Sequence, residues 1–233
     1  MIYSNERKLC LSGWFKENSE KSYSKSLKLQ KFLLLYEAFA KTSGEKTDFS
    51  HLRGYKKGPV FSNVWGDYTK ERTAFDTAAM KTYEAKKDSV NETRAKKCGF
   101  IVFIELLRTY RRRPALKRAR QPTQPLRLTH KMNLWNSKKA RIMSGEYNVN
   151  LDEKDFNEDD KKMIQLLDSM YPIEMIENSI VVDLDKNYFV FSKEDSVKLT
   201  EEHFDTLMLL SERETLHNPV YADIDSEGRL LID

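Results

Sequence analysis

The chain has 233 residues and a mass of 27.4 kDa, enough for one large domain or for one domain with a small appendage. Its hydrophobic fraction of 39% and charged fraction of 33% exclude a chain that is disordered throughout. No run approaches the roughly 18 apolar residues of a membrane span, and no signal-peptide pattern follows the N-terminus. The two cysteines, Cys10 and Cys98, indicate neither a disulfide framework nor a metal site. We therefore expect a cytoplasmic protein with no membrane partner and no cofactor.

Charge is unevenly distributed along the chain, although the net charge is only +4. Residues 1–93 carry 17 basic and 12 acidic side chains, residues 94–141 carry 15 basic and one acidic, and the remainder carries 8 basic and 23 acidic. A segment of one sign attracts partners of the opposite sign and repels others. The pattern favours function through charged macromolecular partners.

The first third of the chain predicts helices. Leu11, Trp14 and Phe15 stand at helical spacing and predict an amphipathic helix. Residues 27–40 are apolar on all sides, which is typical of a central, buried helix, and Ser24 or Ser26 is its expected cap.

A short extended segment then precedes an aromatic-rich helix. Residues 51–57 predict a small strand, after which Gly58 allows a sharp turn and Pro59 is expected at the first position of a new helix. Val60, Val64 and Trp65 give that helix an apolar face, and Trp65 is expected in the core.

The middle of the chain holds its most unusual composition. Residues 98–110 predict a buried helix, although their β-branched content leaves a strand open. Residues 108–127 contain eight basic residues, three prolines and no acidic residue. Prolines in the interior break a helix, so we expect an exposed basic arm that leads into Leu128-Thr129-His130 and Trp135.

The acidic last third predicts both helices and strands. Asn157 is a good N-cap before an acidic first turn. Thr200 caps a further helix, whose apolar residues Phe204, Leu207, Met208 and Leu210 are expected inside. Residues 180–191 predict a hairpin, and residues 220–233 predict two short strands. We therefore expect an α+β fold that is mainly α-helical, with a body of residues 1–170 and a small acidic α+β extension of residues 171–233. Whether the extension is a separate domain stays open.

No catalytic constellation is visible in the sequence. The glycines form no phosphate-binding pattern, and the four histidines lack metal-ligand spacing. The acid pairs fall in first turns of helices, where the helix dipole already explains them. His130 is the best single ionisable candidate, yet the sequence marks no catalytic acid or nucleophile to act with it. We predict that the protein is not an enzyme, with no catalytic residue and no metal.

Three segments of the chain, taken together in this order and spacing, form a recognisable sequence motif. They are Lys28–Tyr36, then Gly54–Val60 followed by Val64, Trp65 and Tyr68, and then Leu128–His130 followed by Trp135. Together they resemble the Panacea domain of SocA-like antitoxins, over roughly residues 4–170. The basic arm and Leu134, where the family has a proline, depart from the pattern.

This resemblance implies a helical body with a short hairpin, and a bacterial or phage-borne antitoxin that neutralises a cognate toxin by direct contact. The residues that it points to for partner binding are Tyr55, Gly58, Pro59, Val60, Trp65, His130 and Trp135.

Two other functions stay open. In the first, residues 94–141 bind nucleic acid, or serve phage counter-defence, through phosphate contacts from Arg111, Arg112, Arg113, Lys117, Arg118 and Arg120. The competing interpretation of this segment is a solvated loop that the acidic third of the chain neutralises. The second function is a hydrolase that uses His130 with a remote acid. The toxin and the oligomeric state are not predicted.

Overall fold

The computed structural model describes residues 1–109, 128–184, 187–212, 216 and 219–232. The chain divides into two compact units: Met1–Phe103 with Arg127–Pro172, and Ile104–Leu126 with Ile173–Asp233. Helices predominate and the described strands form two small sheets, so the expected α+β, mainly helical fold is confirmed. Within the described part of the chain, no helix has the length and apolar character needed to cross a membrane.

The first unit is a helical body with one small sheet. Its elements in chain order are α1 (Glu6–Asn18), α2 (Glu20–Tyr23), α3 (Ser26–Thr42), β1 (Leu52–Tyr55), β2 (Gly58–Phe61), α4 (Ser62–Lys70), α5 (Arg72–Lys86), the 3₁₀ turn η1 (Lys87–Ser89), α6 (Glu92–Thr109, of which residues up to 103 belong here), α7 (Leu128–Lys131), α8 (Asn133–Asn136), α9 (Lys139–Met143), β3 (Val149–Asn150), the 3₁₀ turn η2 (Glu153–Asp155) and α10 (Glu158–Met170).

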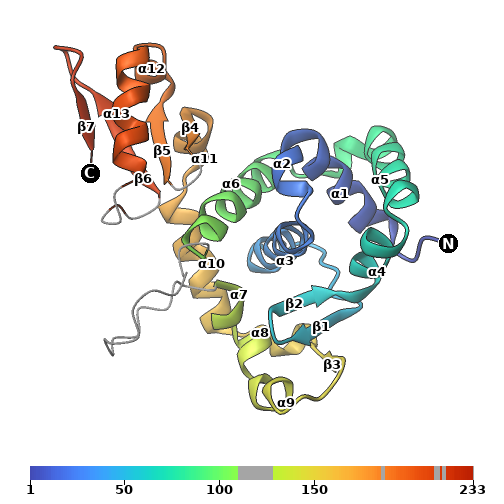
Figure 1. Cartoon of the computed structure of the whole chain (residues 1–233). Helices are drawn as coiled ribbons and strands as arrows, with labels where there is room; N and C mark the ends of the chain where they lie inside the picture. The colour runs from blue at the N-terminus through green and yellow to red at the C-terminus, as the bar shows by residue number, and fades with distance from the viewer. Residues whose placement is uncertain (110–127, 185–186, 213–215, 217–218, 233) are drawn as a thin grey trace. The chain divides into compact units, whose positions relative to one another are not determined.

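Helix α3 lies at the centre of this unit (Figure 1), in contact with α1, α2, α4, α10 and β2. Every residue from Lys28 to Ala40 is buried, which confirms the expected central helix. The predicted cap is wrong, because Lys25 occupies the N-cap position and no side chain caps the helix. Phe32 stacks between Trp14 and Phe15 of α1 at ring-centroid distances of 5.5 and 4.4 Å, so aromatic packing joins the two helices.

A buried ion-pair network ties α1 to α3. Lys8 Nζ donates to Glu37 Oε1 at 2.5 Å and to the Asp48 carbonyl at 2.6 Å, and the lysine and glutamate side chains are 1% and 0% exposed. Arg7 donates two further hydrogen bonds to the Glu37 carboxylate. Burial lowers the pKa of Lys8, and the charges of Glu37 and Asp48 oppose that shift. Removing one member would leave a buried charge without its partner.

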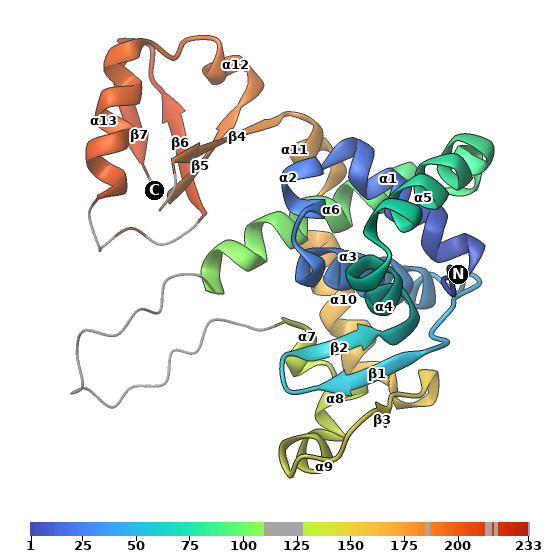
Figure 2. The ribbon, with the colours of Figure 1, turned by 45° about the vertical axis from the view of Figure 1, so that its right-hand side comes forward.

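The three-stranded sheet has the order β2-β1-β3 (Figure 2). The expectation that Pro59 begins a helix is wrong: Pro59 lies in strand β2 opposite Gly54, and α4 begins at Ser62. Ser62 N donates to the His51 carbonyl, and the antiparallel alternation then turns the backbone nitrogens of Pro59 and Phe61 away from β1. Pro59 has no N–H to leave unpaired, and Phe61 N donates to Gln30 Oε1 at 2.8 Å. The proline therefore suits an edge strand.

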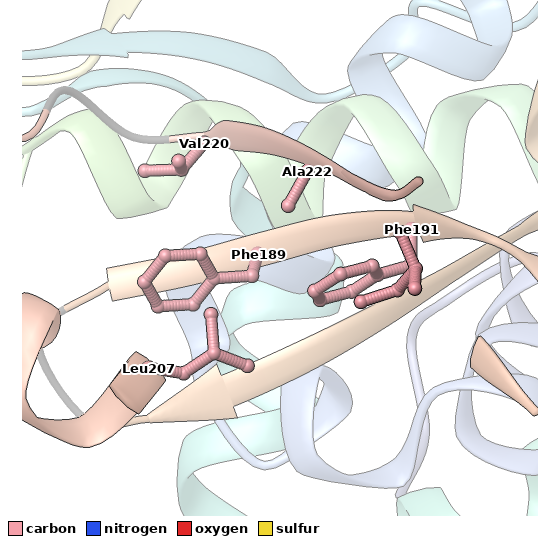
Figure 3. Packing of buried hydrophobic residues seen from close by; sticks show 6 residues of the cluster. Phe189, Phe191, Leu207, Val220 and Ala222 are labelled. Carbon is pink, nitrogen blue, oxygen red and sulfur yellow. The ribbon is translucent and has the colours of Figure 1, made fainter. Parts of the chain in front are cut away.

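The second unit is a four-stranded sheet with a helix across it. Its elements are α11 (Ile173–Glu177), β4 (Ser179–Leu184), β5 (Asn187–Ser192), α12 (Lys193–Ser196), α13 (Glu201–Ser211), β6 (Val220–Ile224) and β7 (Leu230–Ile232). The strand order is β4-β5-β6-β7, and β5 and β6 are parallel. Figure 3 shows Phe189 and Phe191 of β5 packed with Leu207 of α13 and with Val220 and Ala222 of β6.

The predicted caps and strands of the acidic third are confirmed. Asn157 and Thr200 each accept hydrogen bonds at the start of α10 and α13 and complete capping boxes. Phe204 and Met208, which the helical pattern places inside, are instead 39% and 57% exposed. Leu207 is buried in the core of this unit, and the half-buried Leu210 of α13 packs against the same core.

The buried network predicts an unusually large effect for a small substitution. Glu37→Gln should lower the free energy of unfolding by about 3–5 kcal/mol, because the buried Lys8 loses its nearest counter-charge and keeps only the Asp48 carboxylate at 3.4 Å, while the side-chain shape is kept. Denaturant unfolding followed by tryptophan fluorescence reports this unit, since Trp14, Trp65 and Trp135 all belong to it.

The matched control is Glu6→Gln, whose carboxylate pairs with Lys86 at the surface. Such a pair contributes at most about 1 kcal/mol. Equal losses in the two variants would contradict the role assigned to the network.

Candidate hairpin site

The β1–β2 hairpin is closed by a glycine with a demanding backbone. Lys56 and Lys57 form the turn, and Gly58 has a φ of +115°. A glycine that supplies the positive φ after a turn is a common way to close a hairpin. The expected sharp turn at Gly58 is therefore present, although a strand and not a helix follows it.

His130 lies against this glycine. A Cβ at Gly58 would stand 3.1 Å from His130 Cε1 and 3.5 Å from Thr129 Oγ1. His130 Nε2 lies 3.4 Å from the Lys56 carbonyl, which can only accept, so the proton is on Nε2 in this contact. Figures 1 and 2 both show α7 and α8 beside the closed end of the hairpin. The absence of a side chain at Gly58 is what lets the two segments approach.

Trp135 is hydrogen-bonded to β1, the first strand of the hairpin. Its Nε1 donates to the Tyr55 carbonyl at 3.0 Å, and its ring meets the His130 ring edge-on with centroids 4.5 Å apart. Trp135 is only 3% exposed, so its indole serves the fold and is not available to a partner. We call Tyr55, Gly58, Thr129, His130 and Trp135 the hairpin site.

Asp160 fixes the segment that carries Trp135. Its carboxylate is buried and accepts from Asn133 N at 2.6 Å and from Leu134 N at 3.1 Å. Burial raises the pKa of Asp160, and its backbone hydrogen bonds oppose the rise. The helix-dipole interpretation of the Asp159-Asp160 pair is thus incomplete, because Asp160 also anchors the start of α8.

The outer face of the sheet is polar and ordered by two asparagines. Tyr55 Oη donates to Asn148 Oδ1 at 2.8 Å, and the Arg53 guanidinium bonds to Asn150 Oδ1. Asn148 has a φ of +56°, a conformation that asparagine tolerates better than most residues. The sequence interpretation missed both asparagines, and only their preference for turns and left-handed backbone could have marked them.

The predicted partner-binding residues therefore fall into two groups. Tyr55, Gly58, His130 and Trp135 meet one another in the hairpin site, with Pro59 buried in the adjoining strand. Val60 and Trp65 form the second group, which lies outside the hairpin site. Val60 is half-buried opposite Arg53, and Trp65 is 46% exposed on α4.

Trp65 corrects an expectation. It was expected in the core, but Val64, Asp67 and Tyr68 form the buried side of α4, and Trp65 lies on the flank of that side, where it is 46% exposed. The spacing of apolar residues on a short helix does not reveal which of them a neighbouring element covers.

In the hairpin site Gly58, Thr129 and Trp135 are buried, and Tyr55 and His130 are half-buried. Among the residues that the structure describes, no group of three or more His, Cys, Asp or Glu side chains is placed to hold a metal ion. The two open surface hollows that stand out in the described part lie along α4–α5 and beside α13, and neither is lined by a hairpin-site residue. The predicted nucleic-acid contacts, Arg111, Arg112, Arg113, Lys117, Arg118 and Arg120, lie outside the described residues.

Comparisons of the chain with protein-family models, with curated proteins and with solved structures found no match. The resemblance to the Panacea domain therefore stays a prediction.

A substitution at Gly58 tests the close approach of His130. Gly58→Ala should lower the free energy of unfolding of the first unit by more than about 2 kcal/mol, because it adds backbone strain and also displaces His130. Tryptophan fluorescence during denaturant unfolding measures the loss.

Gly44→Ala is the matched control, since Gly44 also has a positive φ, +71°, but a Cβ added there would meet no atom within 4 Å apart from its chain neighbours. Backbone strain alone should lower the free energy of unfolding by about 1 kcal/mol in this variant. If both substitutions cost the same, the contact between His130 and Gly58 is not a constraint on the fold.

Proposed function

We propose that this protein is an antitoxin of a toxin–antitoxin system that neutralises a cognate toxin by direct protein–protein binding, without an enzymatic step. The single observation that carries the proposal is the exposure of Trp65 on α4, the helix that directly follows the β1–β2 hairpin. The resemblance of the three sequence segments to the Panacea domain adds to it.

A half-exposed tryptophan offers a large apolar contact. Trp is enriched among the residues that dominate binding energy at protein interfaces, and its rigid ring loses little conformational entropy on binding. Trp65 is 46% exposed, whereas Trp14 and Trp135 are 2% and 3% exposed. A partner that covers Trp65 would bury the most exposed indole of the chain.

The helix that carries Trp65 is held at its N-terminal end and along its buried side. Strand β2 leads directly into α4, and Gln30 fixes the last residue of that strand through Phe61 N. Asp67 accepts hydrogen bonds from Ser4 N at 2.7 Å and from Ser4 Oγ at 2.6 Å. A surface that is rigid before binding loses less entropy when the complex forms.

The second unit adds an acidic surface with apolar side chains. Residues 173–233 carry 15 acidic and 5 basic residues. On α13 the exposed Phe204 and Met208 are one turn apart, and the exposed Glu201 and Asp205 stand beside them at helical spacing. This combination suits a basic partner, because complementary charge speeds encounter and selects among partners.

Co-expression with the product of the adjacent gene tests the proposal. If that product is the toxin, the chain should relieve its growth arrest and co-purify with it. Trp65→Ala should weaken binding by about tenfold to a hundredfold, in the range of hot-spot losses. Isothermal titration calorimetry with the purified pair measures the change.

Tyr147→Ala serves as the control, since Tyr147 is an aromatic side chain that is 87% exposed in the first unit. Its removal should leave the affinity unchanged. Undiminished toxicity together with no co-purification would reject the antitoxin proposal, and equal effects of the two substitutions would reject the role of Trp65.

A further inference from the structure

The tip of the β1–β2 hairpin gathers positive charge that no described carboxylate neutralises. Lys56 and Lys57 form the turn and are exposed. Lys131 follows His130, whose ring touches Lys56 and Gly58, and it is exposed as well. None of the three lysines forms an ion pair within the part of the chain that the structure describes. They bring three like charges to one end of the sheet.

Further cations come from β1 and from α9. Arg53 bonds to the neutral amide of Asn150. Lys139 stands one helical turn before Ile142, and the Ile142 side chain packs against Gly54 of β1. Lys139 is exposed and has no carboxylate partner among the described residues.

The nearby carboxylates are already occupied by other groups. Asp155 pairs with Lys138 at 2.9 Å, and Glu146 pairs with Arg141. Asp160 is buried and holds the backbone of α8. Among the described residues, no ion pair therefore cancels the charge of the three lysines at the tip.

We propose that the hairpin tip, formed by Lys56 and Lys57 with Lys131 beside it, is a contact site for the phosphate backbone of a nucleic acid. This site is separate from the toxin contact proposed at Trp65, and it does not depend on that proposal. Phosphates present closely spaced negative charges, and neutralising them with lysine releases counterions. Lysine on a mobile four-carbon stem serves such contacts as a point charge.

The chemistry of the tip favours a nucleic acid over an acidic protein. A protein interface requires a buried apolar or aromatic anchor at its centre. Trp135 is buried, and the Tyr55 hydroxyl is bonded to Asn148, so neither supplies one. Interfaces with nucleic acid are more polar and far more positively charged, which matches the exposed lysines of the tip.

The salt dependence of binding tests the site. A fluorescein-labelled duplex DNA and a single-stranded RNA of the same length serve as probes, with fluorescence anisotropy measured on the full chain between about 50 and 200 mM salt. For the double variant K56A/K57A, the slope of log K against log salt should become shallower by about 1.8 on the duplex or about 1.4 on the single strand. Whichever probe the chain prefers, the affinity should fall about tenfold or more near 100 mM salt.

Two matched variants separate specific contact from net charge. K70A/K81A removes two lysines that are exposed along α4–α5 and have no described ion-pair partner, so it lowers the net charge equally. It should leave the slope unchanged. K56R/K57R keeps both charges and should also keep the slope.

Three outcomes would overturn the site. They are no binding of either probe at low salt, equal slopes for K56A/K57A and the unsubstituted chain, and equal changes in K56A/K57A and K70A/K81A. A loss of toxin binding in K56A/K57A with unchanged nucleic-acid binding would assign the tip to a protein partner instead. Failure of the toxin proposal, by contrast, would leave these slopes as they are.

Discussion

Two independent requirements meet at Gly58 in the first unit. Its backbone needs a positive φ, and its missing side chain makes the space in which His130 lies. Any other residue would have to satisfy both at once. Because His130 and Trp135 follow one another within six residues, the approach at Gly58 also brings the Trp135 indole to the Tyr55 carbonyl. The geometry of the hairpin is thus set from outside the hairpin.

The same hairpin is held from two further directions. Gln30 of the central helix bonds to the end of β2 through Phe61 N. On the other side, Asp160 at the start of α10 fixes the backbone of α8, which carries Trp135. Segments that lie far apart in sequence therefore act on one short turn. A surface supported in this way can present exposed side chains such as Trp65 and Lys57 with little loss of order on binding.

Local patterns in the sequence predicted most of the elements and little of how they meet. The apolar run of residues 27–40 and the caps Asn157 and Thr200 act within one element, so they were predictable. Pro59 was misplaced because the same missing N–H suits both a helix start and an edge strand. The pairing of Lys8 with Glu37 joins residues 29 positions apart, and no periodicity of charge marks such a contact. The resemblance pointed to Tyr55, Gly58, His130 and Trp135, but only the fold shows that these residues contact one another.

Four of the seven residues that the resemblance points to for partner binding contact one another in the hairpin site. The Tyr55 carbonyl accepts a hydrogen bond from the Trp135 indole. The His130 ring lies against the Lys56 carbonyl and beside Gly58. A motif of this kind identifies a scaffold, and a scaffold does not define its partner. Partner choice then depends on side chains that the scaffold leaves exposed. Under the two proposals made above, these side chains in the first unit are Trp65 as an apolar contact and the lysines of the hairpin tip as a charged one.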